Sequence, residues 1–151
     1  MKPEEMIFEL EGPRITRADL RTAAESLGLT FPEEYVEFLL QHNGGVSKLC
    51  VSEEPAIRLW RWYSVCREND PPGLWPLVQY NKILWADTET DSVLAIANSV
   101  SDYPVVIKVR GSGKGRIGVW ITDADSVDTI KLPFASFIDL TRHLRHSDEF
   151  M

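Results

Sequence analysis

The clearest pattern of hydrophobic and polar positions lies in residues 27–45, where the sequence reads LGLTFPEEYVEFLLQHNGG. Pro32 suits the first turn of a helix because its φ angle is already helical, and the two glutamates that follow it are stabilised by the helix dipole. The apolar side chains then cover about 200° of the helix circumference; they are Tyr35, Val36, Phe38, Leu39 and Leu40. Residues 43–45, Asn-Gly-Gly, accept left-handed backbone angles and predict a C-terminal cap of that kind. The stretch therefore predicts a mostly buried helix.

Two further helices are predicted on either side of the central region. Thr16 is placed to cap the first, because Asp19 stands three residues later, and Gly28 ends it. Its buried stripe is narrow and consists of Leu20, Ala23, Ala24 and Leu27. Pro133 stands at the predicted start of a C-terminal helix with an apolar side made of Phe134, Phe137, Ile138, Thr141 and Leu144. Residues 1–13 are predicted to form an irregular arm or a short helix.

Strand patterns dominate the middle of the chain. Alternation and β-branched or aromatic residues predict strands at 46–51, 57–66, 93–98, 105–110 and 116–122. In the second of these, alternation places Trp60 and Trp62 on one face and Leu59 and Arg61 on the other. A short helix is predicted within residues 74–85, followed by a loop at 87–91. These elements predict one α+β domain over residues 1–151, with a twisted, mainly antiparallel sheet and the N-terminal helix pair and C-terminal helix packed around it.

The helical stretch also resembles the signature of a known family. A short helix beginning with leucine, a Phe/Leu-Pro-x-x-Tyr-x-x-Phe-Leu core and a terminal Asn-Gly-Gly are similar to the SUKH (Smi/Knr-like) superfamily. The matching residues are Leu27, Pro32, Tyr35, Phe38, Leu39, Asn43, Gly44 and Gly45. Looser matches are an Ile-Ala strand at 94–97, a Gly-Val-Trp strand at 118–120 that leads to Asp123, and a Phe-rich helix near 134–144. The chain departs from the family at 98–102, where Asn-Ser-Val-Ser-Asp replaces the usual glycine-rich turn.

The resemblance implies a function as well as a fold. Known members of the superfamily are mostly bacterial immunity proteins against secreted polymorphic toxins, with some fungal regulators of cell-wall synthesis. It therefore implies an immunity protein that neutralises a cognate toxin by non-covalent binding and is not an enzyme. The alternative is a regulatory scaffold or small-ligand-binding module of the same fold, and a metal-dependent hydrolase is the less favoured third hypothesis.

Charge and hydropathy narrow the range of partners. The chain carries 23 acidic and 16 basic residues, a net charge of −7, and an acidic surface repels phosphate backbones, which disfavours direct nucleic-acid binding. No run of apolar residues approaches the roughly 18 that a membrane span needs. The N-terminal segment is acidic where a signal peptide is basic and then apolar. We therefore expect a cytoplasmic protein that acts away from membranes.

Several residues invite a chemical interpretation. The GSGKG sequence at 111–115 lacks the earlier glycine and the following Ser or Thr of a phosphate-binding loop, and it is predicted to be a hairpin loop. Cys50 and Cys66 form no metal-binding or disulfide pattern and are predicted to be reduced, buried thiols. His42 is predicted to bond free carbonyls at a helix end. No cofactor is predicted.

A metal site has one candidate set of ligands. Asp139, His143 and His146 are spaced i, i+4, i+7 and would share one face of the C-terminal helix. A solvated polar face explains these residues equally well. Because one terminal helix supplies all the ligands, no metal is included in the predicted function.

The remaining candidate is a protein-binding surface. Tryptophan and tyrosine commonly anchor interfaces, although core packing is expected to take at least half of those in this chain. The predicted contact residues are two tryptophans and two groups of loop acids: Trp60, Trp62, Asp87, Glu89, Asp91, Asp123, Asp125 and Asp128. Acids around an aromatic centre suit a basic toxin domain, with nucleases among the candidates.

Overall fold

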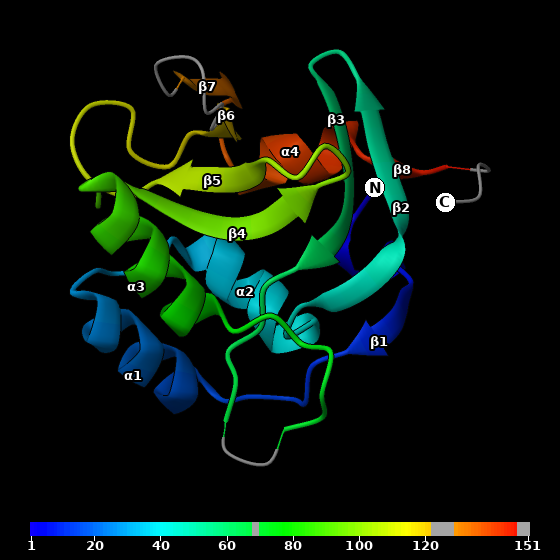
Figure 1. The fold of residues 1–151 in the computed structure, drawn as a ribbon. Helices are drawn as coiled ribbons and strands as arrows, with labels where there is room; N and C mark the ends of the chain where they lie inside the picture. Colours follow the sequence, from blue (N-terminus) through cyan, green and yellow to red (C-terminus); the bar gives the residue numbers. More distant parts are fainter. Residues whose placement is uncertain (68–69, 122–128, 148–151) are drawn as a thin grey trace.

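The computed structural model describes residues 1–67, 70–121 and 129–147 (Figure 1). Within these residues, one eight-stranded sheet combines with four α-helices and one 3-10 helix. The strands are β1 (Phe8–Glu11), β2 (Gly45–Glu53), β3 (Ala56–Trp62), β4 (Val93–Ser99), β5 (Pro104–Lys108), β6 (Ile117–Ile121), β7 (Thr129–Phe134) and β8 (Arg145–His146). The helices are η1 (Pro3–Glu5), α1 (Arg17–Leu27), α2 (Glu33–Gln41), α3 (Leu77–Thr88) and α4 (Phe137–His143). The predicted α+β class is confirmed.

The sheet follows the chain in order. Strands β1 to β7 lie side by side in sequence order, each pair antiparallel, and β8 pairs with Cys50 and Val51 of β2. Helices α2 and α4 pack against each other, and α4 also contacts β2 and β7. Helix α3 lies against β4, and α1 contacts α2 and α3 (Figure 1). No helix among the described residues is both long and apolar enough to cross a bilayer.

Helix α2 forms the centre of the core, as its pattern predicts. Tyr35, Phe38 and Leu39 are buried, and the ring of Phe38 lies 5.1 Å from both Trp62 of β3 and Phe137 of α4. The end of the helix differs from the prediction. His42 closes α2 in an extended conformation, and its N–H bonds the Phe38 carbonyl at 2.7 Å. The residues with positive φ, Gly44 and Gly45, come only after His42.

The Asn-Gly-Gly sequence instead joins three segments. The Asn43 amide donates to the carbonyls of Pro13 (2.9 Å) and Val65 (3.0 Å), and its oxygen accepts from the Val65 N–H (2.8 Å). Gly44 has φ +66°, and a Cβ there would collide with the carbonyl of Tyr63. The motif therefore holds the end of α2 against the segment before α1 and the segment after β3.

Helix α1 has the ends that the sequence predicts. Asp19 N–H donates to the Thr16 hydroxyl (3.2 Å), and Thr16 N–H donates to the Asp19 carboxylate (2.8 Å), which completes a capping box. The bond from the Thr16 backbone lowers the pKa of Asp19. Gly28 ends the helix with φ 68°.

Three boundaries differ from the predictions, and one predicted loop is confirmed. Phe8–Glu11 form a strand, so residues 1–13 are not simply an arm or a short helix. Helix α3 runs to Thr88 and includes Asp87, which was expected in a loop. The C-terminal helix begins after Ser136, whose hydroxyl accepts from Asp139 N–H at 3.1 Å, because Pro133 belongs to β7. The 111–115 segment joins β5 to β6, which confirms the predicted loop.

Candidate protein-interaction surface

An extra residue in β3 decides which way its tryptophans point. Leu59 and Arg61 are two residues apart, yet their partners in β4 are consecutive, so the pairing shifts by one residue between them. A bulge of this kind re-aims the side chains around it. Leu59 and Trp62 are both fully buried, while Trp60 and Arg61 are partly exposed between them.

The prediction that Trp62 shares an exposed face with Trp60 is therefore wrong. The Trp62 side chain is fully buried, and its indole N–H donates to the Ser47 hydroxyl at 3.1 Å. Simple alternation fails here because the bulge reverses the order of faces after Leu59. Trp62 belongs to the core, and Trp60 is the tryptophan of β3 that a partner can reach.

Arg61 connects Trp60 to a second partly exposed tryptophan, Trp75, from another part of the chain. Its guanidinium lies 4.5 Å from the ring centre of Trp75 and 5.2 Å from that of Trp60. Its Nη1 donates to the carbonyl of Gly73 at 3.1 Å. A cation within about 6 Å of an aromatic ring is attracted to it. The segment before α3 is thus held against β3 by a cation between two indoles.

Trp75 also packs against two tyrosines. Its ring stacks on Tyr63 at 5.9 Å and on Tyr80 at 6.3 Å, and the two tyrosine rings lie 4.6 Å apart. Tyr63 is fully buried, and this burial raises the pKa of its hydroxyl, which stays neutral. The partly exposed rings of Trp75 and Tyr80 therefore rest on a buried aromatic base and have little freedom to move.

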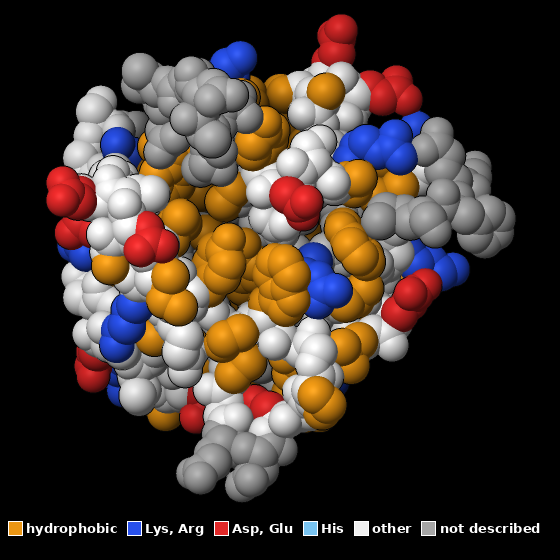
Figure 2. Space-filling model, in the orientation of Figure 1, with side chains coloured by type: hydrophobic (Ala, Val, Ile, Leu, Met, Phe, Trp, Pro, Cys, Tyr) orange, Lys and Arg blue, Asp and Glu red, His pale blue; other side chains and the backbone are white. Residues whose placement is uncertain are grey.

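Helix α3 extends this surface. Tyr80 and Ile83 are three residues apart and lie on the same helical face; Ile83 is 63% exposed. We call the set Trp60, Arg61, Trp75, Tyr80 and Ile83 the aromatic surface. Figure 2 shows hydrophobic side chains gathered around Lys or Arg over the middle of this face, where β3 and β4 meet the start of α3. Exposed apolar surface of this kind is typical of protein-interaction sites.

Three of the predicted acids lie in the last turn of α3 and the segment that follows it. Asp87 lies in the last turn of α3, Glu89 follows it with φ 56°, and Asp91 comes next; all three are exposed. The Arg110 guanidinium lies 3.7 Å from the Asp91 carboxylate and also donates to its backbone carbonyl (3.0 Å). This acidic group is at the opposite end of α3 from Trp75. Asp123, Asp125 and Asp128 lie outside the described residues.

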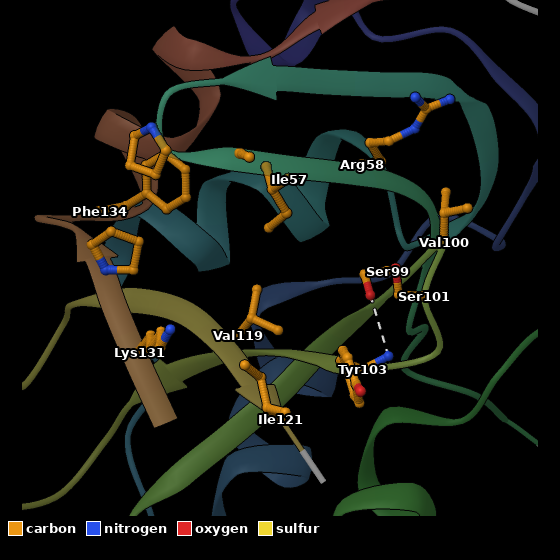
Figure 3. A pocket seen from close by; sticks show the side chains of 13 residues that line it. Ile57, Arg58, Ser99, Val100, Ser101, Tyr103, Val119, Ile121, Lys131 and Phe134 are labelled. Carbon is orange, nitrogen blue, oxygen red and sulfur yellow. Dashed lines mark hydrogen bonds between the residues drawn. The ribbon is translucent and has the colours of Figure 1, made fainter. Parts of the chain in front are cut away.

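A separate groove lies between β3 and the last strands of the sheet. It has a volume of about 530 Å³, and the side chains that line it are mostly apolar, including Ile57, Val100, Val119, Ile121, Pro133 and Phe134. Figure 3 shows Ile57 of β3 and Val119 of β6 pointing toward each other across it, with Arg58 and Lys131 at opposite ends. Sequence reasoning missed this groove because its residues come from strands that are far apart in the chain.

The match to a known family covers most of this structure. Residues 14–142 match the model of the SMI1/KNR4 family (SUKH-1). The chain belongs to this family. No curated protein and no solved structure gives a significant match. The resemblance noted in the sequence is therefore confirmed at the level of the family.

The SUKH signature residues of this chain serve the fold. Leu27, Tyr35, Phe38 and Leu39 are all buried in the core, and Asn43 makes three hydrogen bonds to backbone groups. None of them belongs to the aromatic surface. The signature therefore accounts for the fold of this chain and does not specify the aromatic surface.

The structure separates the candidate metal ligands. Helix α4 ends at His143, whose Nδ1 donates to the Asp139 carbonyl at 2.7 Å. His146 lies in β8, where its Nε2 accepts from the Ile7 N–H at 3.1 Å. The predicted shared helical face is therefore wrong. No three potential metal ligands cluster anywhere in the described part of the chain.

His42 and the cysteines have structural surroundings. The Nε2 of His42 donates to the Pro3 carbonyl (2.9 Å) and its Nδ1 contacts the Glu11 carboxylate (2.6 Å), so it ties the N-terminal segment to α2. Both cysteines are free thiols; Cys50 is buried and Cys66 is half-buried. Burial raises the pKa of the Cys50 thiol to about 11, and burial also raises that of Cys66.

Proposed function

We propose that this SUKH-1 chain is an immunity protein that neutralises a cognate secreted toxin by non-covalent binding. Family membership is consistent with that role. The observation that carries the proposal is the aromatic surface, in which Trp60, Arg61 and Trp75 are held in a fixed, partly exposed arrangement. Trp, Tyr and Arg are the residues that most often supply binding energy at protein interfaces.

The proposed mechanism is occlusion of the toxin's active site or substrate path. It requires shape and affinity from this chain, and no catalytic residue. A specific interface buries about 800 Å² on each partner, and each large aromatic side chain can contribute about 150–250 Å². The aromatic surface would form the apolar centre of such an interface, with polar residues of α3 around it.

We further propose that the toxin domain is basic, as a nuclease would be, and that neutralisation takes place in the cytoplasm. The net charge of −7 and the exposed acids Asp87, Glu89 and Asp91 support a basic partner. Charge of opposite sign speeds association more than it strengthens the final complex. Replacing Asp87 and Glu89 with lysine should therefore slow association at low salt and have less effect at high salt.

The test begins with the purified protein as bait in the lysate and secreted fraction of its own source. Recovery of a toxin-domain polypeptide at near one-to-one stoichiometry, whose toxicity in a bacterial host is suppressed when this chain is co-expressed, supports the proposal. Recovery of polypeptides that are harmless to the host, or toxicity that persists on co-expression, contradicts it.

A second candidate function is a regulatory scaffold or small-ligand-binding module, and the groove favours it. Its volume of about 530 Å³ and mostly apolar walls are typical of small-molecule sites. Native mass spectrometry of the protein taken from its own source would test this. A bound small molecule at one-to-one stoichiometry that is lost in Ile121→Trp supports a ligand site, and the mass of the chain alone argues against it.

A further inference from the structure

Arg61 is a cation fixed at the centre of an apolar surface. The Trp75 ring lies 4.5 Å from its guanidinium, the Trp60 ring 5.2 Å, and the Gly73 carbonyl accepts from Nη1 at 3.1 Å. A long, flexible arginine normally loses much side-chain freedom when it binds a partner. Here the contacts on both sides already restrict the side chain, so that loss is smaller on binding.

The guanidinium also has no acidic partner within the described residues. Its interactions there are the two ring contacts and the bond to Gly73. A guanidinium carries five N–H donors, so most of them face other acceptors or solvent. If a partner covered Trp60 and Trp75 without offering an acceptor, those donors would be buried unpaired, which is strongly unfavourable.

We propose that Arg61 binds a carboxylate on the partner protein, in the middle of an apolar contact with Trp60 and Trp75. A carboxylate matches the planar fork of a guanidinium and accepts two parallel hydrogen bonds. This proposal rests on the proposed function only in that a protein partner meets the aromatic surface. It adds the chemistry of the partner: an aspartate, glutamate or C-terminal carboxylate ringed by apolar groups.

A basic toxin can carry such a group. The exposed acids at the far end of α3 would face the basic region of the partner, while Arg61 would face its carboxylate. A metal-dependent nuclease combines both features, because carboxylates hold its divalent cations and its substrate channel is basic. Arg61 would then contact the catalytic centre of the toxin.

Selection from a library of random short peptides displayed on phage tests this directly. The wild-type protein is immobilised and Arg61→Gln protein is added in solution as competitor, so that only peptides that need Arg61 are retained. We expect the retained peptides to share an Asp or Glu beside aromatic or aliphatic residues. Binding of such a synthetic peptide should weaken about ten- to a hundredfold in Arg61→Gln, and by a similar factor when its acid is changed to the amide.

Two variants complete the design. Arg61→Lys keeps the charge and loses the planar fork, so it should bind the peptide more weakly than wild type. Arg142→Gln removes an exposed arginine of α4 and should leave binding unchanged. Thermal unfolding establishes that each variant is folded, and if Arg61→Gln is not, Arg61→Lys decides the result.

The proposal is overturned if no peptide depends on Arg61, if the retained peptides lack acids, or if the peptide's affinity falls less than about threefold in both Arg61 variants. The peptide selection uses no toxin. Its failure would therefore leave the immunity role standing, whereas peptide binding without toxin neutralisation would show a carboxylate-binding surface with another role.

Discussion

Asn81 holds α3 on the sheet and so positions one side of the aromatic surface. Its side chain is fully buried, and its amide donates to the carbonyls of Leu77 and Ala95, both at 2.9 Å. Its oxygen accepts from the Ala95 N–H at 2.7 Å. Ala95 lies where the pairing of β4 with β5 shifts in register, and Asn81 satisfies both of its backbone groups. Replacing Asn81 with alanine would leave these two groups unpaired in the core.

The expected loss of stability follows from the number of backbone groups left unpaired, which is two. A buried backbone group without a partner costs about 1–3 kcal/mol, so two of them should lower the free energy of unfolding of Asn81→Ala by about 2–6 kcal/mol. That is a large part of the roughly 5–15 kcal/mol by which a domain is stable. Urea unfolding followed by circular dichroism measures it, and Gln79→Ala, on the exposed side of α3, should change stability by less than about 0.5 kcal/mol.

A loss below about 1 kcal/mol for Asn81→Ala, with an unchanged denaturant slope, would refute this reasoning. The hydrogen bonds would then contribute little, and α3 would be held by apolar packing alone. A denaturant slope lower than that of the wild type would instead indicate that α3 is already detached in the folded variant.

Three further predictions follow from single sites. Gly44→Ala should destabilise the protein by about 3 kcal/mol or more, because its φ is +66° and a Cβ would collide with backbone. Gly111→Ala should cost about 1 kcal/mol, because its φ is also positive but no atom of the described residues lies within 4 Å of the added Cβ. Tyr35→Phe should leave stability unchanged or raise it by about 1 kcal/mol, because the buried hydroxyl has no hydrogen-bond partner among the described residues. Cys50 should be alkylated far more slowly than Cys66 at pH 8, because a pKa of about 11 leaves roughly one thiol in a thousand ionised.

Each of these has a clear contrary result. Equal losses in the two glycine variants, measured by urea unfolding, would show that no collision occurs at Gly44. A loss above about 1 kcal/mol in Tyr35→Phe would show that its hydroxyl is bonded. Equal alkylation rates, read by mass spectrometry, would show that Cys50 is not shielded.

The raised pKa of Cys50 also makes stability depend on pH. An unfolded thiol ionises near pH 8.5, so the stability that protonated Cys50 contributes is complete below that pH and is lost as the pH rises toward 11.

The helices could be predicted where their signals are local. Thr16 and Asp19 cap α1 through each other, and the apolar arc of α2 alone indicates a buried helix. Pro133 misled the prediction because proline suits both a helix start and an edge strand, where a missing N–H is not needed. Among the described strands, β7 pairs with β6 alone and is such an edge. Whether this segment forms a strand depends on its pairing with β6, which the local sequence does not encode.

The interaction surface could be predicted by residue type but not in its geometry. Trp60 was expected to face a partner and is partly exposed, whereas Trp62 is buried by a bulge that exists only because of the pairing with β4. The contact of Arg61 with Trp75 brings together residues from β3 and from the segment before α3, and no local pattern indicates it. Ile83 has an apolar signal in the sequence, but only the packing of α3 shows that it is exposed.

The central claim is that this SUKH-1 chain neutralises a toxin through the aromatic surface. The most direct measurement is the growth of a bacterial host that co-expresses the captured toxin domain with Ile83→Glu or, as a matched control, Ile138→Glu. Ile83 is 63% exposed on α3, and Ile138 is 42% exposed on α4, away from the surface. The account predicts that wild type and Ile138→Glu restore growth and that Ile83→Glu does not; equal protection by both variants would contradict it.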